Sequence, residues 1–396
     1  MKNISQISLK GKKVLIRVDF NVPLDEYFNI TDDSRIIASL PTIKKVISNG
    51  GRAILMSHLG RPKNGFEEKF SLQHVIKPLS KLLNSKIIFC KDCIGITTTE
   101  KVNTMLDGDV LVLENLRFYS EEKEGNENFA KKLSHLGDIY VNDAFGTAHR
   151  THASTAIITK FFYEKKYLGL LLYNELKALK KVLTNPKRPF TAIIGGAKIS
   201  GKIDVLQSLF SKVDNLIIGG GMAYTFVKSI GGNVGKSLVE DNKLDLARKL
   251  IEEADKKGVN LILPVDSVNA NGFKNDAKIN FSNILSIRDE YMGLDIGAQS
   301  IIKFSNIIMA SKTLIWNGPM GVFEMKNFEN GTKQIGEIIC RATENGAFSL
   351  IGGGDSIASV KKFNFSKRVS YISTGGGAML EYLEGKQLPA VAAITD

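Results

Sequence analysis

Thr191-Ala-Ile-Ile-Gly-Gly-Ala-Lys198 runs from a short apolar, β-branched stretch directly into a glycine turn. The same pattern occurs three more times before the C-terminus, in residues 215–221, 348–355 and 369–377. Short apolar runs of this kind are typical of buried parallel strands. The second half of the chain is therefore predicted to fold as an α/β domain around a parallel sheet.

The glycines that end these four runs predict a binding site. A residue without a Cβ atom lets the backbone approach a ligand closely. A helix that begins after such a turn directs its N–H groups and the positive end of its dipole toward an anion. Because ligands of open α/β sheets bind beyond the carboxyl ends of the strands, the four turns indicate a phosphate-rich ligand, most simply a nucleotide.

Arginine is scarce in this chain, and in the first half it stands in polar, turn-rich motifs. Only 11 of the 53 basic residues are arginines. The planar guanidinium group can bind two carboxylate or phosphate oxygens at once. A single arginine would be read as an ordinary surface charge, but several beside strand-like runs predict a site for a small polyanion. The arginines concerned are Arg17, Arg35, Arg61, Arg117 and Arg150.

Five stretches of the chain resemble those of phosphoglycerate kinases. They are residues 17–23 (RVDFNVP), 57–62 (SHLGRP), 143–150 (DAFGTAHR), 317–324 (NGPMGVFE) and 352–355 (GGGD). The resemblance runs from the first strand to the C-terminal tail, in the order of the family. It implies an α/β fold of two doubly wound, Rossmann-like parallel-sheet lobes joined by a hinge helix. It also implies a phosphotransferase with a carboxyl acceptor, which moves a phosphoryl group reversibly from 1,3-bisphosphoglycerate to MgADP in glycolysis and yields 3-phosphoglycerate and MgATP.

The chain is expected to divide at a helix near its middle. Apolar residues recur at helical spacing from Leu170 to Leu183, and Asn185-Pro186 ends the pattern. The arginine motifs precede this segment and the glycine turns follow it. We therefore expect a triose-binding domain in residues 1–168, a connecting helix in 169–185 and a nucleotide-binding domain in 186–379. The resemblance also implies that residues 380–396 fold back onto the first domain and that the helix acts as a hinge.

The resemblance assigns the triose ligand to residues of the first domain. Asp19 and Asn21 would contact the hydroxyl and carboxyl end of the substrate. Arg35 would lie beside the reacting carboxyl group and stabilise the phosphoryl group during transfer. The other implied substrate-binding residues are His58, Arg61, Arg117 and Arg150, at the distal phosphate, with Phe20, Leu59 and Gly60.

The nucleotide and its Mg²⁺ are assigned to the second domain. Lys202 would follow the transferred phosphate with support from Lys198, both on one helix face if a helix opens after Gly196. Asp355 would hold Mg²⁺ together with phosphate oxygens, and Gly376 would direct N–H groups at the migrating phosphate. Further implied nucleotide contacts are Gly293 at the adenine, Glu324 at the ribose, and Gly353, Gly354 and Ser356.

The composition of the chain indicates its class and its cellular compartment. The chain is 43% hydrophobic and 24% charged, as in an ordinary soluble globular protein. Neither an apolar run of the ~18 residues that a membrane helix requires nor the apolar core of a signal peptide occurs. Three cysteines in 396 residues argue against a disulfide framework. We therefore expect a cytoplasmic protein without a membrane partner, and the resemblance implies a monomer.

Two other functions, nucleic-acid binding and nucleotide-dependent regulation without catalysis, are alternatives to a kinase. The formal charge of +12 suits anionic small ligands, but it would also suit a nucleic-acid binder. The excess charge lies in scattered lysines, so no nucleic-acid partner is expected. Residues 230–237 resemble a Walker loop but begin with Ile230 where glycine is required. Cys90 and Cys93 form a lone CxxC without a second pair of ligands.

Overall fold

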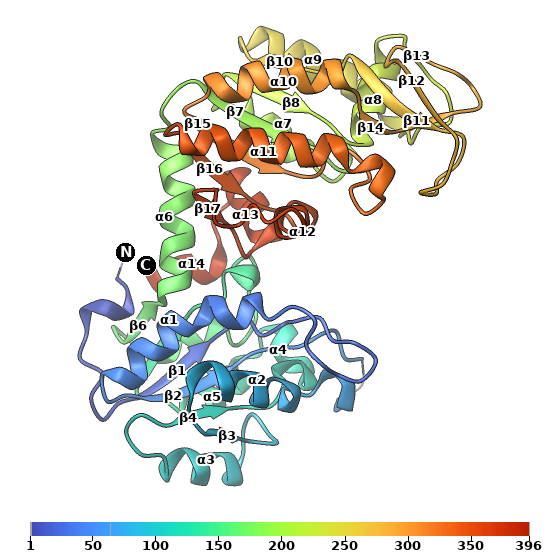
Figure 1. The fold of residues 1–396 in the computed structure, drawn as a ribbon. Coiled ribbons are helices and arrows are strands. Elements are labelled where there is room, and N and C mark those ends of the chain that lie inside the picture. Colours follow the sequence, from blue (N-terminus) through green and yellow to red (C-terminus); the bar gives the residue numbers. More distant parts are fainter. Residues whose placement is uncertain (1, 64, 396) are drawn as a thin grey trace. The chain divides into compact units, whose positions relative to one another are not determined.

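The computed structural model describes residues 2–63 and 65–395, which form two compact units (Figure 1). The first unit contains the residues up to Lys177 and those from Gln387 onward. The second unit contains Ala178–Lys386. The division falls inside helix α6 (Leu170–Thr184), the segment whose periodicity predicts a helix. Among the described residues, no helix combines the length and the apolar character that crossing a membrane requires.

The first unit is built on a six-stranded parallel sheet in the order β3-β4-β2-β1-β5-β6. Val14 and Ile16 of β1 pack in a core cluster with Ile36 and Ile43 of α1, while the alternate residue Leu15 is equally buried. Both faces of the sheet are therefore covered, as in a doubly wound fold. The strands are β1 (Lys13–Arg17), β2 (Arg52–Met56), β3 (Ile87–Phe89), β4 (Val110–Val112), β5 (Ile139–Asn142) and β6 (Lys166–Leu168).

The helices of the first unit range from the five residues of α4 to the fifteen of α1, and α5 carries a side-chain cap. The Asn126 side chain accepts a hydrogen bond from the Phe129 N–H at the start of α5, as asparagine does at helix N-termini. The α-helices are α1 (Ser34–Ser48), α2 (Gln73–Leu83), α3 (Ile96–Asn103), α4 (Ser120–Glu124), α5 (Glu127–Ser134) and α14 (Pro389–Thr395). The 3₁₀ turns are η1 (Ile4–Gln6), η2 (Glu68–Phe70), η3 (Leu116–Phe118), η4 (Phe145–Thr147) and η5 (Ile157–Phe161).

The second unit has its own six-stranded parallel sheet, in the order β10-β8-β7-β15-β16-β17. All four apolar runs that precede glycine turns are strands of this one sheet, so that prediction is confirmed. The strand order reverses between β7 and β15, which is where open α/β sheets bind ligands. The strands are β7 (Phe190–Ile194), β8 (Asn215–Ile218), β10 (Asn260–Ile262), β15 (Thr313–Asn317), β16 (Phe348–Ile351) and β17 (Tyr371–Ile372).

The helices of the second unit follow the glycine turns or connect neighbouring strands. Helices α8, α12 and α13 begin directly after the second, third and fourth turns. The α-helices are α7 (Ile203–Leu209), α8 (Met222–Ser229), α9 (Leu244–Lys256), α10 (Ala298–Ala310), α11 (Asn330–Glu344), α12 (Gly354–Lys362) and α13 (Gly376–Leu383). The 3₁₀ turns are η6 (Asp241–Lys243) and η7 (Lys326–Phe328).

Two small sheets in the second unit were not predicted. One is antiparallel, in the order β12-β11-β14, and the other is a two-stranded parallel pair of β13 and β9. Phe281 in β12 is 74% exposed, so this strand lacks the apolar continuity of the main sheet. The strands are β9 (Asn233–Val234), β11 (Asp266–Ala270), β12 (Ile279–Asn283), β13 (Ser286–Ile287) and β14 (Met292–Ile296).

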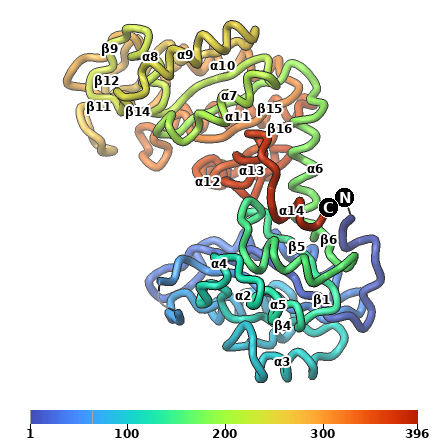
Figure 2. Tube along the Cα trace, turned by 180° about the vertical axis from the view of Figure 1, so that it is seen from behind, coloured from blue at the N-terminus to red at the C-terminus, as the bar shows by residue number. Residues whose placement is uncertain are grey.

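The C-terminal tail leaves the second unit later than the predicted residue 380. Helix α13 stays with the second unit, where the Ser208 hydroxyl of α7 donates to the Leu383 carbonyl oxygen over 2.7 Å. The tail then belongs to the first unit. In α14, the Ala390 N–H donates to Ala148 O, and the Lys166 ammonium donates to Ala393 O. Figure 2 shows the red C-terminal segment beside the green residues of β6.

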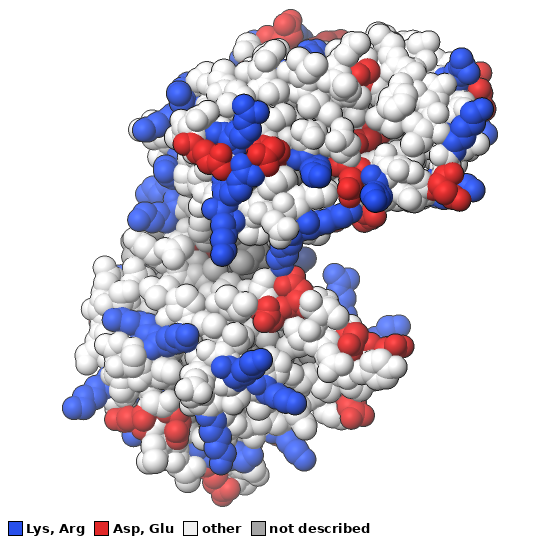
Figure 3. All heavy atoms as spheres, in the orientation of Figure 1, with Lys and Arg blue, Asp and Glu red and all other residues white. Residues whose placement is uncertain are grey.

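Charged side chains of both signs are mixed on the surface. In the face drawn in Figure 3, the atoms of lysine and arginine alternate with those of aspartate and glutamate rather than forming a single tract. Several are paired locally, such as Arg368, which contacts the carboxylates of Glu337 and Glu344. On this face the positive charge is thus spread over separate positions.

Candidate active site

In the second unit the glycine turns lie in adjacent pairs. The Met222 N–H, after the second turn, donates to Gly196 O in the first turn over 3.0 Å. A Cβ atom on Gly220 would lie 2.5 Å from Gly196 N, so only glycine fits that contact. The third and fourth turns also adjoin, because a Cβ on Gly376 would lie 3.5 Å from the Gly353 Cα. The backbone N–H groups of four strand ends therefore gather at one edge of the sheet.

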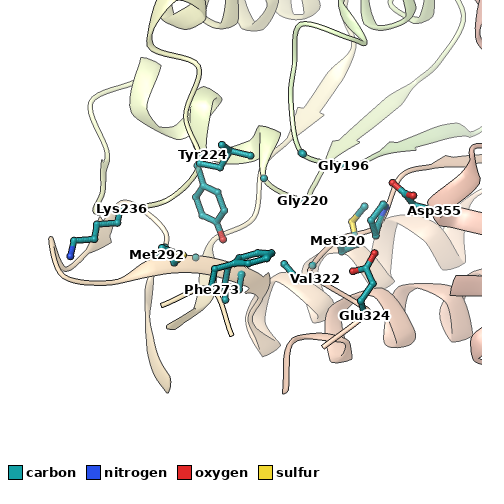
Figure 4. A pocket seen from close by; sticks show the side chains of 17 residues that line it. Gly196, Gly220, Tyr224, Lys236, Phe273, Met292, Met320, Val322, Glu324 and Asp355 are labelled. Atoms are coloured by element: carbon teal, nitrogen blue, oxygen red, sulfur yellow. The ribbon is translucent and has the colours of Figure 1, made fainter. Parts of the chain in front are cut away.

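A cavity of about 440 Å³ opens beside the first two turns (Figure 4). Its walls are largely apolar and include Tyr224 and Phe273, with Gly293 and Leu294 of β14. Glu324 and Asp355 lie on one side of this cavity, and Lys236 lies at the opposite end. The shape fits a flat apolar ring at one end and a charged group at the other, which is the pattern of ligand pockets in general.

Three predicted nucleotide contacts line this cavity, and the others do not. Gly293, Glu324 and Asp355 are at its surface. Gly293 has no room for a side chain, because its Cβ would lie 2.0 Å from the Tyr224 hydroxyl. The residues that stand outside the cavity lining are Lys198, Lys202, Gly353, Gly354 and Ser356.

Ser356 and Gly353 are nevertheless in contact with the strand that ends beside the cavity. The Ser356 hydroxyl accepts a hydrogen bond from the Gly318 N–H over 2.6 Å, which leaves its proton able to be donated. Gly353 has a φ of +92°, and a Cβ there would lie 2.8 Å from the Asn317 Nδ2. This pair therefore anchors the turn before α12, on which the Asp355 carboxylate is exposed.

Lys202 is held by oxygen atoms at the end of the central strands. Its ammonium donates to Gly195 O over 2.6 Å, to Asn317 O over 2.9 Å and to Asn317 Oδ1 over 2.7 Å. Three acceptors use all three ammonium protons. Burial lowers the pKa of Lys202 to about 8, although the charge of Asp355 acts in the opposite direction. The lysine therefore stands at the switch point of the sheet with a pKa close to neutral pH.

No helix opens directly after Gly196, so the condition for Lys198 and Lys202 to share a helix face is not met. Helix α7 begins at Ile203, so Lys202 precedes the helix and Lys198 is exposed in an irregular loop. Gly196 itself has a φ of +107°, so it lies outside any helix. The Glu240 carboxylate accepts hydrogen bonds from the N–H groups of Ile199 and Ser200, which fixes the loop in its irregular course.

In the first unit, five predicted residues form a continuous chain of contacts beyond β1. Arg35 Nη1 donates to both carboxylate oxygens of Asp19, over 3.1 and 3.2 Å, and to Asn21 O over 3.1 Å. The Asn21 Oδ1 accepts from the Gly60 N–H over 2.8 Å. Gly60 O in turn accepts from Arg117 Nη1 over 2.8 Å. The sequence motifs of residues 17–23 and 57–62 thus converge with Arg117.

His58 lies beneath this chain as a neutral imidazole. Burial, with the charges of Arg17 and Arg117, holds the pKa of His58 well below its ordinary value. Arg17 Nη2 lies 3.1 Å from His58 Nδ1. Because a guanidinium group only donates, Nδ1 must be the acceptor, and the proton of the imidazole is on Nε2. His58 can therefore donate one hydrogen bond to an anion without carrying a charge.

The remaining predicted residues of the first unit differ in exposure. Arg61 and Arg150 are exposed, while the side chains of Phe20 and Leu59 are in the core, so the latter two can reach a ligand only through their backbone. Burial and the charge of Arg17 lower the pKa of Arg117 to about 10. Its buried Nε has no hydrogen-bond partner among the described residues, which fits a donor for a ligand oxygen.

Sequence reasoning missed a buried network that supports these arginines. Arg17 is fully buried, and its Nε donates to the Ser154 hydroxyl over 3.0 Å. The Ser154 hydroxyl donates to the buried carboxylate of Glu122 over 2.6 Å. Asn115 donates to Leu59 O over 2.7 Å and accepts from the Arg117 N–H over 3.0 Å. The sequence motifs grouped Arg17 with the anion-binding arginines, but its guanidinium is fully buried and bonded within the protein, so it supports the site instead of reaching a ligand.

Asp143, which was left outside the predicted site, has a structural role. Its Oδ1 accepts hydrogen bonds from the N–H groups of Leu171 and Leu172, over 2.9 and 3.2 Å, and so caps the first turn of α6. Burial raises the pKa of Asp143 to about 7. A Cβ on Gly169 would lie 2.1 Å from this carboxylate, so the glycine before the helix is required.

Comparisons with known proteins identify the family of this chain. A family model described as phosphoglycerate kinase matches residues 4–386. The chain belongs to the phosphoglycerate kinase family. Phosphoglycerate kinases from Porphyromonas gingivalis and Chlorobium phaeobacteroides are 52% and 53% identical to it, over 99% and 100% of this chain and 99% of each relative.

Solved structures of the family share the fold. Phosphoglycerate kinase from Coxiella burnetii is 41% identical to this chain with a TM-score of 0.90, and covers 99% of this chain and 98% of its own. The enzyme from Pyrococcus horikoshii is 31% identical with a TM-score of 0.86, over 100% and 98%. The prediction of an α/β fold with Rossmann-like parallel sheets is confirmed.

The Walker-like segment and the CxxC pair do not form a phosphate-binding loop or a metal site among the described residues. Residues 230–237 contain the short strand β9, and only Lys236 of this segment lines the cavity, as its exposed rim. Cys90 and Cys93 are buried free thiols, and Cys93 Sγ donates to Glu114 O over 2.9 Å. Burial raises the pKa of both thiols, which disfavours the reactive thiolate.

Proposed function

We propose that this chain catalyses reversible transfer of the acyl phosphate of 1,3-bisphosphoglycerate to MgADP, which gives 3-phosphoglycerate and MgATP in glycolysis. The observation that carries the proposal is the pairing of two different anion sites in one chain of this family. One site has glycine turns and Lys202 beside an apolar cavity. The other has a neutral histidine, His58, on which the charges of Arg17, Arg117 and Arg35 act. Phosphoryl transfer needs positioning and positive charge rather than a nucleophilic side chain.

The triose ligand belongs to the first unit in this proposal. The exposed part of Arg35, which is already aligned by Asp19 and Asn21, would contact the reacting carboxyl group. Arg117, with Arg61 and Arg150, would bind the distal phosphate, and His58 Nε2 would add a neutral donor. The fork of a guanidinium group matches the oxygens of both anionic ends.

The nucleotide belongs to the second unit. The apolar cavity fits the base, Glu324 fits the ribose hydroxyl groups, and the glycine turns fit the phosphates. The Lys202 ammonium would leave the oxygens of Gly195 and Asn317 and donate to oxygens of the transferring phosphate instead. The N–H groups near Gly376 would stabilise the charge that develops during transfer. Donors fixed in advance are usually the largest electrostatic contribution to catalysis.

The residues present also fit Mg²⁺ with the nucleotide. Asp355 supplies an exposed carboxylate in the first turn of α12, and Mg²⁺ is commonly bound by one or two carboxylates together with phosphate oxygens. When bound, Mg²⁺ would neutralise phosphate charge. Asp355 would thereby orient the phosphate chain toward Lys202, on whose charge it already acts.

The proposed reaction is tested by trapping its product. Incubation of the protein with MgATP, 3-phosphoglycerate and hydroxylamine should yield a hydroxamate, because hydroxylamine displaces phosphate from an acyl phosphate. Omission of 3-phosphoglycerate serves as the control and should abolish the hydroxamate. A folded protein that releases phosphate from ATP without forming hydroxamate would contradict the proposal.

The proposal includes closure around α6. Each ligand is assigned to a different unit, so transfer requires the two to be brought together, and closure would protect the acyl phosphate from water. We expect both ligands together to reduce the radius of gyration measured by small-angle scattering, and neither ligand alone to do so fully. An unchanged radius with both ligands bound would contradict closure.

The proposal also places the protein in the cytoplasm as a monomer. The three cysteines are all free and buried, which agrees with a reducing compartment. Sedimentation equilibrium at micromolar concentration should give the mass of one chain, 43.5 kDa.

A dependence on pH follows from the pKa of Lys202. The protonated lysine is the form that stabilises phosphate charge, and its pKa in the free protein is about 8. The quantity kcat/KM for the nucleotide, which reports the free enzyme, should therefore fall as pH rises through about 8. The fall in kcat should occur at higher pH, since bound phosphate favours the ammonium form. A kcat/KM that is level up to pH 10 would contradict this role.

A further inference from the structure

The loop between β7 and α7, residues 195–202, carries both lysines of the proposed nucleotide site. Its first part is fastened to the neighbouring strand end. The Gly195 N–H donates to Asn317 O over 2.9 Å, and the Gly196 N–H donates to Pro319 O over 3.1 Å. These bonds fix the glycines but not the residues that follow, where the chain turns back toward α7.

The second part of the loop is fastened by the carboxylate of Glu240. Its Oε2 accepts hydrogen bonds from the Ile199 N–H over 2.7 Å and the Ser200 N–H over 3.1 Å. The Glu240 N–H donates to the hydroxyl of Thr225, a buried residue of α8, over 3.2 Å. Although desolvation opposes ionisation, hydrogen bonds from Ser200 and Ile199 lower the pKa of Glu240. The group is therefore an anionic clamp between α8 and the loop.

A short chain of contacts connects this clamp to the ammonium group of Lys202. Ile199 is fully buried, and its carbonyl oxygen accepts from the Lys202 N–H over 2.9 Å. The turn that starts at Ile199 thus sets the direction of the Lys202 side chain, whose Nζ reaches Gly195 O and Asn317. Without the carboxylate, two backbone donors of the loop would lose a charged acceptor.

We propose that Glu240 is a positioning residue for phosphoryl transfer, which acts by holding the loop so that Lys202 meets the transferring phosphate. The inference rests on the proposed function. Glu240 lies in the loop before η6, is not among the residues that line the cavity, and acts only through the backbone that it binds. Its charge also faces Lys198, so a general charge effect must be separated from the clamp.

The neighbouring Asp241 provides a matched control. It carries the same charge, is 70% exposed at its side chain, and pairs with Lys228 over 2.7 Å rather than with the loop. Glu240→Gln keeps an oxygen acceptor of the same length without the charge. Glu240→Ala removes the acceptor, and Asp241→Ala removes only a nearby charge.

The experiment combines steady-state kinetics with calorimetric binding of MgADP and a thermal unfolding curve for each variant. We expect Glu240→Ala to lower kcat about tenfold and to weaken MgADP binding several-fold, with KM for 3-phosphoglycerate unchanged. Glu240→Gln should recover most of kcat, and Asp241→Ala should match the wild type. A variant that only loses stability would leave the ratio of the two KM values unchanged.

The outcomes separate this inference from the proposed function. Failure of the wild type to turn over would count against the proposed function, while calorimetry would still show whether Glu240 affects nucleotide binding. An active wild type with an equally active Glu240→Ala variant would overturn the inference. So would a Glu240→Gln variant no better than Glu240→Ala, or an Asp241→Ala variant with the same defect.

Discussion

Lys202→Ala is expected to reduce kcat by about 100- to 1000-fold, the loss seen when one fixed donor to a transition-state charge is removed. In the free protein the Lys202 ammonium contacts three oxygens at the ends of β7 and β15. Alanine would leave these oxygens without that donor and the transferring phosphate without its nearest lysine. Steady-state turnover at saturating MgATP and 3-phosphoglycerate measures the effect.

Lys198→Ala is the matched control for Lys202. Both lysines are in the same loop, but Lys198 is exposed, and the ammonium that donates to the strand ends is that of Lys202. Its replacement should reduce kcat far less, with the larger part of its effect on KM for the nucleotide. If both variants lost the same activity, the distinct role of Lys202 would be wrong and general positive charge would explain the site.

Arg35→Ala is expected to lower kcat about 100-fold while the Kd of MgADP, measured by calorimetry, stays within about twofold. Arg35 belongs to the first unit, and its contacts are to Asp19 and Asn21, far along the chain from the nucleotide residues. Removal of the guanidinium would also leave the largely buried Asp19 carboxylate without its ion-pair partner. Thermal unfolding should therefore show a modest loss of stability.

Arg35→Lys distinguishes charge from geometry at this position. A lysine keeps the charge but has no planar fork to bind two oxygens in fixed directions. We expect it to recover the stability lost in Arg35→Ala but little of kcat. Equal losses in kcat and in nucleotide affinity for Arg35→Ala would show that the role assigned to Arg35 is wrong.

The main strands could be predicted from the sequence because a buried strand requires a continuous run of apolar residues. Parallel strands covered on both faces need continuous apolar runs, as in β7 (Phe190–Ile194), where every residue is buried. The glycine turns could also be recognised, since a Cβ at Gly220 or Gly353 would collide with neighbouring atoms. Such steric demands act on single positions and leave few alternatives to glycine.

Other features depended on partners distant in the sequence. The loop before α7 is irregular because a carboxylate 41 residues after Ile199 binds its backbone. The tail boundary depends on the contact of Ser208 with Leu383, which no local pattern reveals. The half-exposed strand β12 (Ile279–Asn283) lacks the apolar run by which the main strands were found.

In the candidate site too, some residues could be predicted from the sequence and others could not. Charged residues in recognisable motifs, such as Arg35 and Asp355, were predicted from the resemblance, and their roles stay predictions. The groups that support them were missed, because Glu122 and Asn115 act from within the fold through Ser154 and the backbone of Leu59. A buried polar residue becomes interpretable only when its hydrogen-bond partners are known.

The most direct test of the central claim is a coupled assay of ATP-dependent phosphorylation of 3-phosphoglycerate, run on the wild type and on Lys202→Ala. We expect turnover by the wild type that requires both substrates and Mg²⁺, and loss of this turnover in a variant with the same thermal unfolding curve. A folded wild type without turnover, or a Lys202→Ala variant with full turnover, would contradict it.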